Sequence, residues 1–242
     1  MLATEDVSLL PSSRAWPLRR LWYWCGSAWR LFRHVPVRWA GLALLPMLVE
    51  VILQLSIPLV GVALSKLLVP VVSMGCLLML DQRVRDGCFD PARGMRRLRA
   101  MRGRVLQLAL LSAGVFVFQL SVVCLWLDPQ AALGMATGDM AVVARFNRLQ
   151  MAGVLASGML PALLLFFTTP HMVLGNAPFC IALRDNLRWL HKGWRPLSGY
   201  MAVLTGLVAG SVFQPWLLLP LLMLGPVGYW AYRDAIDPRP AD

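Results

Sequence analysis

Charge is scarce in this sequence: 14% of its 242 residues are charged, whereas 58% are hydrophobic and the mean hydropathy is +0.64. A soluble domain averages about 25% charged and about 45–50% apolar residues. The shortage of charge excludes an ordinary water-soluble core and indicates a membrane protein. Because a helix needs ~20 apolar residues to cross a bilayer, the chain has room for about six spans.

Acidic residues are fewer than basic ones: 12 Asp and Glu stand against 23 Lys and Arg, which gives a formal net charge of +11. In a soluble protein this balance is typical of nucleic-acid binding. No segment here is polar enough to form a soluble domain, so nucleic acid is not expected as a partner. Basic residues of membrane proteins instead collect on the cytoplasmic side, where they meet anionic lipids.

Motifs of familiar catalytic chemistries are missing from the sequence. It holds no HExxH, no P-loop, no GxSxG and no pair of aspartates inside its apolar segments. Its five cysteines form no CxxC, and no Cys-His spacing suits a metal. The N-terminus lacks the apolar run and cleavage site of a cleavable signal peptide. We therefore expect no enzyme, no metal and no other cofactor.

Six apolar segments run through the chain, so the sequence predicts an all-α bundle of six transmembrane helices. We expect a polar tail at 1–16, one membrane domain at 17–235 and a second polar tail at 236–242. The expected spans cover residues 39–56, 59–80, 105–127, 151–174, 197–213 and 216–230.

Amphipathic, basic segments precede the first, third and fifth spans. Over residues 17–34, apolar residues recur at helical spacing with arginines on the other face, which is typical of a helix in a membrane interface. Asp90-Pro91 predicts the start of a second such helix, because Asp caps helices and Pro suits their first position. Residues 176–196 repeat the pattern. Residues 128–150 are expected to form a loop, and whether the three units are true repeats stays open.

Nearly all basic residues fall on one side of this arrangement, which predicts an even number of spans with both termini cytoplasmic. The loop on the opposite side carries only Arg145 and Arg148 as bases. We expect the interfacial helices to contact anionic lipid headgroups. The candidate headgroup contacts are Arg19, Arg20, Arg30, Arg33, Arg96, Arg97, Arg99, Arg184, Arg188 and Lys192.

Two opposite charges interrupt the first pair of spans. Glu50 and Lys66 are equally far from Pro58, where the chain is expected to turn, so both lie ~12 Å below the turn. Pairing in an antiparallel hairpin offsets part of the roughly 2.5–3.5 kcal/mol that a charge costs at the bilayer centre. The pair is either a structural contact or the polar lining of a substrate or proton path. Snorkelling of Lys66 without pairing is the third interpretation.

A polar patch is expected near the cytoplasmic end of the fourth span. Thr168, Thr169 and His171 surround Pro170 there, within an otherwise apolar run. A hydrogen-bonded structural histidine is one interpretation, and a proton relay or ligand contact is the other.

The two ends of the membrane domain carry a resemblance. Trp29, Leu31, Phe32 and Pro36 form a W-x-L-F-x-x-x-P segment, the segment DNLRWLHKGWRPLSGY precedes the fifth span, and the chain closes with GYWAYRDAI. In these segments it resembles an uncharacterised family of proteobacterial six-span inner-membrane proteins. The resemblance implies a helical bundle with an inner-membrane address, and it brings no catalytic residues. The acidic, proline-rich tail of some members is absent here.

Two functions are expected from these features. The first is a non-enzymatic scaffold or accessory protein, or one with a lipid-associated role; the second is a transporter or channel for small molecules or lipids, with Glu50 and Lys66 in its polar interior. Pairing without a cavity would favour the first function. An open cavity lined by Glu50, Lys66 or His171 would favour the second.

Overall fold

The computed structural model describes residues 16–237, with only the backbone of Met223. Arg14, Arg239 and nearly all of the two expected tails lie outside these residues. Every regular element in the described range is a helix, which confirms the all-α expectation for this part of the chain. The helices are α1 (Arg19–His34), α2 (Pro36–Ser56), α3 (Gly61–Asp86), α4 (Pro91–Ala100), α5 (Arg102–Trp126), α6 (Pro129–Thr137), α7 (Met140–Val143), α8 (Arg148–Ser157), α9 (Met159–Leu164), α10 (Thr168–Val173), α11 (Phe179–Ser211), η1 (Pro215–Leu217) and α12 (Leu218–Ile236).

Three helices, α2, α3 and α5, are long and apolar enough to cross a membrane. They contain 21, 26 and 25 residues. At 1.5 Å per residue their lengths run from ~31 to ~39 Å, against a hydrocarbon thickness of about 30 Å. Few of their side chains are buried inside the protein, so much of their apolar surface is not covered by other helices.

The α2–α3 hairpin turns at residues 57–60, as the position of Pro58 predicts. Leu59 adopts a positive φ of 67°, a conformation that non-glycine residues rarely take. Gly61 follows at the start of α3, where an added Cβ would lie 2.3 Å from the Leu53 carbonyl oxygen. Only glycine allows the two helices to approach this closely at the turn.

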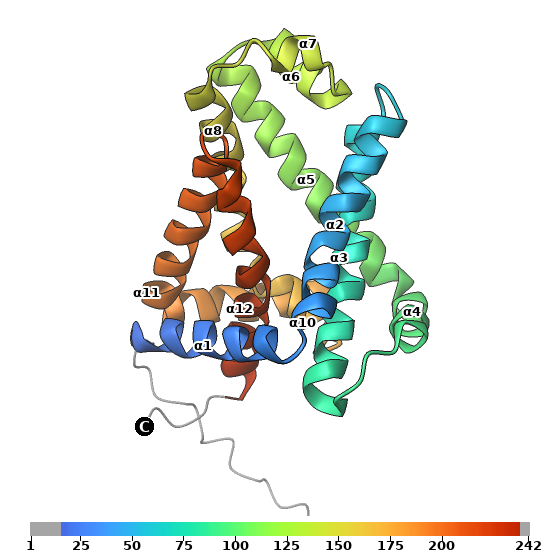
Figure 1. The fold of residues 1–242 in the computed structure, drawn as a ribbon, viewed down its shortest axis with the longest axis vertical. Helices are drawn as coiled ribbons and strands as arrows, with labels where there is room; N and C mark the ends of the chain where they lie inside the picture. The colour runs from blue at the N-terminus through green and yellow to red at the C-terminus, as the bar shows by residue number, and fades with distance from the viewer. Residues whose placement is uncertain (1–15, 238–242) are drawn as a thin grey trace, which may run out of the picture.

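Several helices gather at the lower end of the molecule in Figure 1. There α1 runs across the ends of the upright helices, and the first half of α11 runs alongside it, with α4 and α10 at the same level. Asp90 caps α4 as predicted, because its side chain accepts the Arg93 N–H at 2.9 Å. The opposite end carries α6 and α7.

Helix α1 has two apolar faces. One packs on the protein through Trp24, Ser27 and Ala28, which are buried. The other exposes Trp22 and Trp29, whose side chains are positioned as an interfacial helix requires. Sequence periodicity over residues 17–34 predicted this helix.

Trp16 belongs to the folded part of the chain, although the expected boundaries place it in the tail. Its ring is 8% exposed, and its backbone N–H donates to the Lys192 carbonyl at 2.8 Å. It packs edge-on against Trp24 and Phe167. An added Cβ on Gly193 would lie 2.5 Å from the Trp16 ring, so this glycine makes room for it.

The expected fourth span, residues 151–174, is not one helix. It is divided into α8, α9 and α10, with breaks at residue 158 and residues 165–167. Pro161 and Pro170 each stand in the first turn of the helix that follows a break. Proline has no N–H to donate to the preceding turn, which explains why the helix restarts at both places.

Two further elements differ from the sequence-based expectation. The third amphipathic helix and the fifth span form a single helix, α11, of 33 residues with Pro196 inside it. A proline inside a helix bends its axis, and α11 first runs across the lower end and then turns upward (Figure 1). The expected loop at 128–150 contains α6 and α7. Asp128 accepts the Ala131 N–H at 2.6 Å, so Asp128-Pro129 starts α6 by the same signal as Asp90-Pro91.

Candidate functional site

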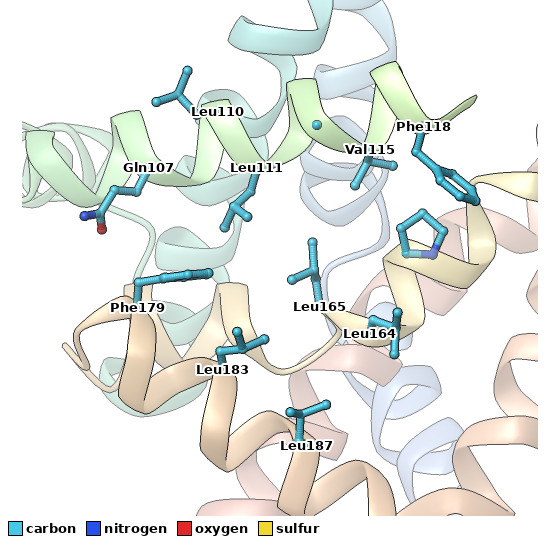
Figure 2. A pocket seen from close by; sticks show the side chains of 12 residues that line it. Gln107, Leu110, Leu111, Val115, Phe118, Leu164, Leu165, Phe179, Leu183 and Leu187 are labelled. Carbon is cyan, nitrogen blue, oxygen red and sulfur yellow. The ribbon is translucent and has the colours of Figure 1, made fainter. Parts of the chain in front are cut away.

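An apolar groove of about 670 Å³ lies between α5, α9 and the first half of α11; we call it the α5 groove. Figure 2 shows Gln107, Leu111, Val115 and Phe118 along its α5 wall. Among the described residues that line it, Gln107 is the single one with a polar side chain. Ligand pockets measure about 300–1,000 Å³, so the groove has the size and apolar lining of a ligand site.

A basic pocket of about 670 Å³ lies at the start of α5. Arg97, Gly103, Arg104 and Asn176 contribute to its lining. Arg104 Nη1 donates to Asn176 Oδ1, which joins α5 to the segment before α11. Gln107 in the α5 groove is about one helical turn beyond Arg104, so the basic pocket and the groove adjoin.

Glu50 and Lys66 lie in contact between α2 and α3. Lys66 Nζ donates to Glu50 Oε1; the Lys66 side chain is 29% exposed and the Glu50 side chain 30%. Gln54 Nε2 also donates to Glu50 Oε1, at 3.1 Å. The Lys66 ammonium lies 5.7 Å from the centroid of the Phe116 ring on α5, a favourable cation–π geometry. The ion pair thus brings together all three long apolar helices.

The pair is not sealed inside the protein. It lines a cavity of about 330 Å³ together with Ser73 on α3 and with Ser112 and Gln119 on α5. These three polar side chains were not predicted as part of a site. Ser112 and Gln119 lie seven residues apart and therefore on one face of α5, a spacing that signals a polar stripe in an apolar helix. The arrangement can hold water or a small polar group beside the two charges.

Asp81, near the lower end of α3, is the centre of a charged cluster that sequence analysis missed. Its side chain is 5% exposed and accepts hydrogen bonds from Tyr229 Oη at 3.0 Å and from Arg85 Nε at 2.9 Å. Arg233 Nη1 lies 3.7 Å away and Arg97 Nη1 3.9 Å away. Three arginines therefore compensate one buried carboxylate.

A second buried carboxylate, Asp234, fastens α1 to α12. Its Oδ2 accepts hydrogen bonds from Trp24 Nε1 at 3.0 Å and from Arg20 Nη1 at 3.2 Å. The Arg20 guanidinium also lies over the Trp16 ring, 5.1 Å from its centroid. The closing Tyr-Arg-Asp segment is thus largely buried. In the sequence, an acid next to aromatic residues within an apolar helix indicates such a buried carboxylate.

Of the expected polar patch, His171 makes side-chain contacts with other helices. Its Nε2 lies 3.5 Å from Asp185 Oδ2, and its Nδ1 lies 3.2 Å from Tyr232 Oη. The Tyr232 hydroxyl carries a proton and is able to donate it to Nδ1 in a hydrogen bond. Thr169 is half-buried. Thr168 is buried, and its Oγ1 has no hydrogen-bond partner among the described residues.

Asn186 on α11 bridges the break between α9 and α10. Its side chain is buried; Oδ1 accepts the Phe167 N–H at 2.7 Å, and Nδ2 donates to the Leu164 carbonyl at 2.6 Å. These two backbone groups lose their helical partners where the span is interrupted. The amide supplies both replacements, because it is donor and acceptor at once.

The predicted headgroup contacts differ in their exposure. Arg20 and Arg97 are half-buried and pair with Asp234 and Asp81. Lys192 is half-buried. The exposed residues of the set are Arg19, Arg30, Arg33, Arg96, Arg99, Arg184 and Arg188.

No group of three or more His, Cys, Asp or Glu side chains in the described part of the chain is placed to hold a metal ion. The comparisons with family models, with curated proteins and with solved structures found no match for this chain.

Proposed function

We propose that this chain is a six-span protein of the bacterial inner membrane, with both termini in the cytoplasm, that binds anionic membrane lipids at its cytoplasmic end. Its role is non-enzymatic, as a scaffold or accessory protein with a lipid-associated function. The three spans beyond α2, α3 and α5 are the interrupted segment α8–α10, the upper half of α11, and α12. Figure 1 supports this assignment, because α11 turns upward and α12 stands beside it.

One observation carries the lipid part of the proposal: the lower end joins exposed tryptophans to exposed arginines. On α1, Trp22 and Trp29 are 76% and 53% exposed, and Arg30 and Arg33 are exposed on the same helix. Tryptophan favours the headgroup level of a bilayer, and each base near an anionic surface contributes about 1 kcal/mol. A lipid surface satisfies both kinds of side chain together.

Lipid analysis of the full chain in nanodiscs tests this function. In mixed phosphatidylcholine and phosphatidylglycerol discs, we expect phosphatidylglycerol to be enriched over the lipid supplied, with protein-free discs as reference. The double variant Arg30→Gln with Arg33→Gln should lose part of the enrichment. Arg145→Gln with Arg148→Gln, at the other end, should retain it. Equal lipid composition with and without protein would contradict the proposal.

A transporter or channel is the second candidate, because Glu50 and Lys66 pair beside a cavity, and a cavity there is the outcome expected to favour transport. The pair is about 30% exposed, and polar side chains from α3 and α5 surround it. The test is movement of a fluorescent phosphatidylglycerol between the leaflets of proteoliposomes, followed by dithionite quenching. Faster movement than in empty liposomes, reduced by Lys66→Met, would support lipid transport. Equal rates would speak against it.

A further inference from the structure

We propose that the α5 groove and the basic pocket together form a site for one anionic glycerophospholipid, with the phosphate at Arg104 and Arg97 and an acyl chain in the groove. This inference rests on the proposed function, since it names the place where a particular lipid is held. It goes beyond general contact between a basic surface and a membrane.

The α5 wall runs from basic to apolar along one helix face. Arg104, Gln107, Leu111, Val115 and Phe118 follow one another at spacings of three or four residues, which places them on the same side of the helix. The fourteen residue-to-residue steps from Arg104 to Phe118 cover ~21 Å at a rise of 1.5 Å each. One leaflet of the hydrocarbon core is about 15 Å thick, so the wall is long enough for an acyl chain with its headgroup at the interface.

The opposite wall begins at the same place. Asn176, which accepts a hydrogen bond from Arg104, precedes Phe179, Leu183 and Leu187 of α11 at spacings of three and four residues. In Figure 2, Gln107 and Phe179 lie at one end of the groove, with the leucines beyond them. The polar end of both walls therefore coincides, as an amphiphile with one charged end requires.

Charge complementarity identifies the headgroup as an anion. Among the described residues, no carboxylate lies within ion-pair distance of Arg104, whose partner Asn176 is neutral. Arg97 lines the same pocket and is 39% exposed, although it is shared with Asp81 at 3.9 Å. Two guanidinium groups at a membrane interface form a phosphate site, because each offers several N–H donors in a plane.

The lining favours a lipid chain as the occupant of the groove. Apart from Gln107 at its polar end, the described residues that line the α5 groove have apolar side chains or, at Gly114, none, around a space of about 670 Å³. A flexible acyl chain suits such a space, and its partner chain can remain in the bilayer.

Native mass spectrometry of the full chain in detergent tests the site with added phosphatidylglycerol or phosphatidylcholine. Gly114→Leu should place a side chain in the groove, because Gly114 lines it and nothing lies within 4 Å of a Cβ added there. Gly206→Leu on α11 is its matched control, since Gly206 is equally unobstructed and lies outside the groove. Arg104→Gln removes the charge at the polar end.

We expect wild type and Gly206→Leu to retain one phosphatidylglycerol molecule. Arg104→Gln should weaken phosphatidylglycerol binding about tenfold and phosphatidylcholine binding less, because the choline cation offsets the charge of the phosphate in the second lipid. Gly114→Leu should weaken the binding of both lipids. Glycerol 3-phosphate, which has the headgroup phosphate without acyl chains, should not displace the bound lipid.

Three outcomes would overturn the inference. The first is lipid binding by Arg104→Gln and Gly114→Leu equal to wild type, and the second is displacement by glycerol 3-phosphate. The third is a change of oligomeric state in Gly114→Leu, which would assign the groove to a second copy of the chain. If nanodiscs still enrich phosphatidylglycerol in any of these cases, the proposed function stands and only this site fails.

Discussion

The buried acids at the lower end each accept hydrogen bonds from a different helix. Asp81 on α3 accepts from Tyr229 on α12, and Asp234 on α12 accepts from Trp24 on α1. A carboxylate out of water is costly unless donors surround it. These residues therefore specify which helices meet at this end, because any other arrangement would leave a charge without donors.

Breaking the ion pair between α2 and α3 should destabilise the protein. Glu50→Gln leaves the Lys66 ammonium without its counter-charge, at an expected cost of about 2 kcal/mol for a pair about 30% exposed. Thermal unfolding in detergent measures the loss. The double variant Glu50→Leu with Lys66→Met should recover much of it, since no charge is then left unpaired. If the double variant is as unstable as Glu50→Gln, the pair is not what stabilises the hairpin.

Substitutions in the Asp81 cluster should lower the unfolding free energy more than substitutions in an exposed ion pair. Asp81→Leu leaves three arginines without their carboxylate, and we expect a loss of about 3–5 kcal/mol in unfolding free energy. Tyr229→Phe removes one hydrogen bond to a charged group and should cost about 2 kcal/mol. The control is Asp86→Asn, because Asp86 pairs with Arg93 in solvent, with side chains 40% and 57% exposed, and should cost under about 1 kcal/mol. Similar losses for Asp81→Leu and Asp86→Asn would exclude a special role for the cluster.

For individual residues, the sequence predicted one contact from the symmetry of two positions about a turn, but it did not predict which charged side chains are buried. The contact between Glu50 and Lys66 was predictable because the two residues are equally far along the chain from the turn at Pro58. Asp81 stands beside an arginine-rich run, and such a run is usually solvated. Its burial depends on α12, which is far away in the sequence, so no local pattern reveals it.

Among the helices, the interrupted segment α8–α10 depends on one side chain from α11. Asn186→Leu should leave the Phe167 N–H and the Leu164 carbonyl unsatisfied, at a cost of about 3 kcal/mol. Thermal unfolding of the detergent-purified chain measures it. Ser198→Ala, an exposed position on the same helix, should change stability by less than about 0.5 kcal/mol. Unchanged stability of Asn186→Leu would show that the break satisfies its backbone groups in another way.

Helix starts were predictable where an Asp-Pro pair was recognised. Asp90-Pro91 predicted α4, and the same signal at Asp128-Pro129 starts α6 inside a segment expected to be a loop. Hydrophobicity alone described residues 151–174 as one span, because it is insensitive to where prolines and a distant Asn186 interrupt a helix. The fusion of two expected helices into α11 has a related cause: Pro196 bends the helix without ending it.

For the whole molecule, helical class and the three long apolar helices follow from composition and periodicity. The α5 groove does not, because its walls come from α5, α9 and α11, and their relative positions depend on packing between distant segments. The six-span arrangement stays a prediction. It requires residues 88 and 180 on one side of the membrane and residue 140 on the other.

Cysteine labelling in intact cells tests that arrangement. Cys88, between α3 and α4, and Cys180, in the first turn of α11, are exposed. Met140 begins α7, which lies at the opposite end of the molecule in Figure 1, and is 73% exposed. A membrane-impermeant maleimide should label Met140→Cys from outside, in a Cys88→Ser and Cys180→Ser background. The native thiols of Cys88 and Cys180 should react only after the membrane is permeabilised. The interrupted segment α8–α10 lies between residues 140 and 180. If Cys180 in the native chain and Met140→Cys were both labelled from outside, this segment would not cross the membrane. The six-span proposal would then be wrong.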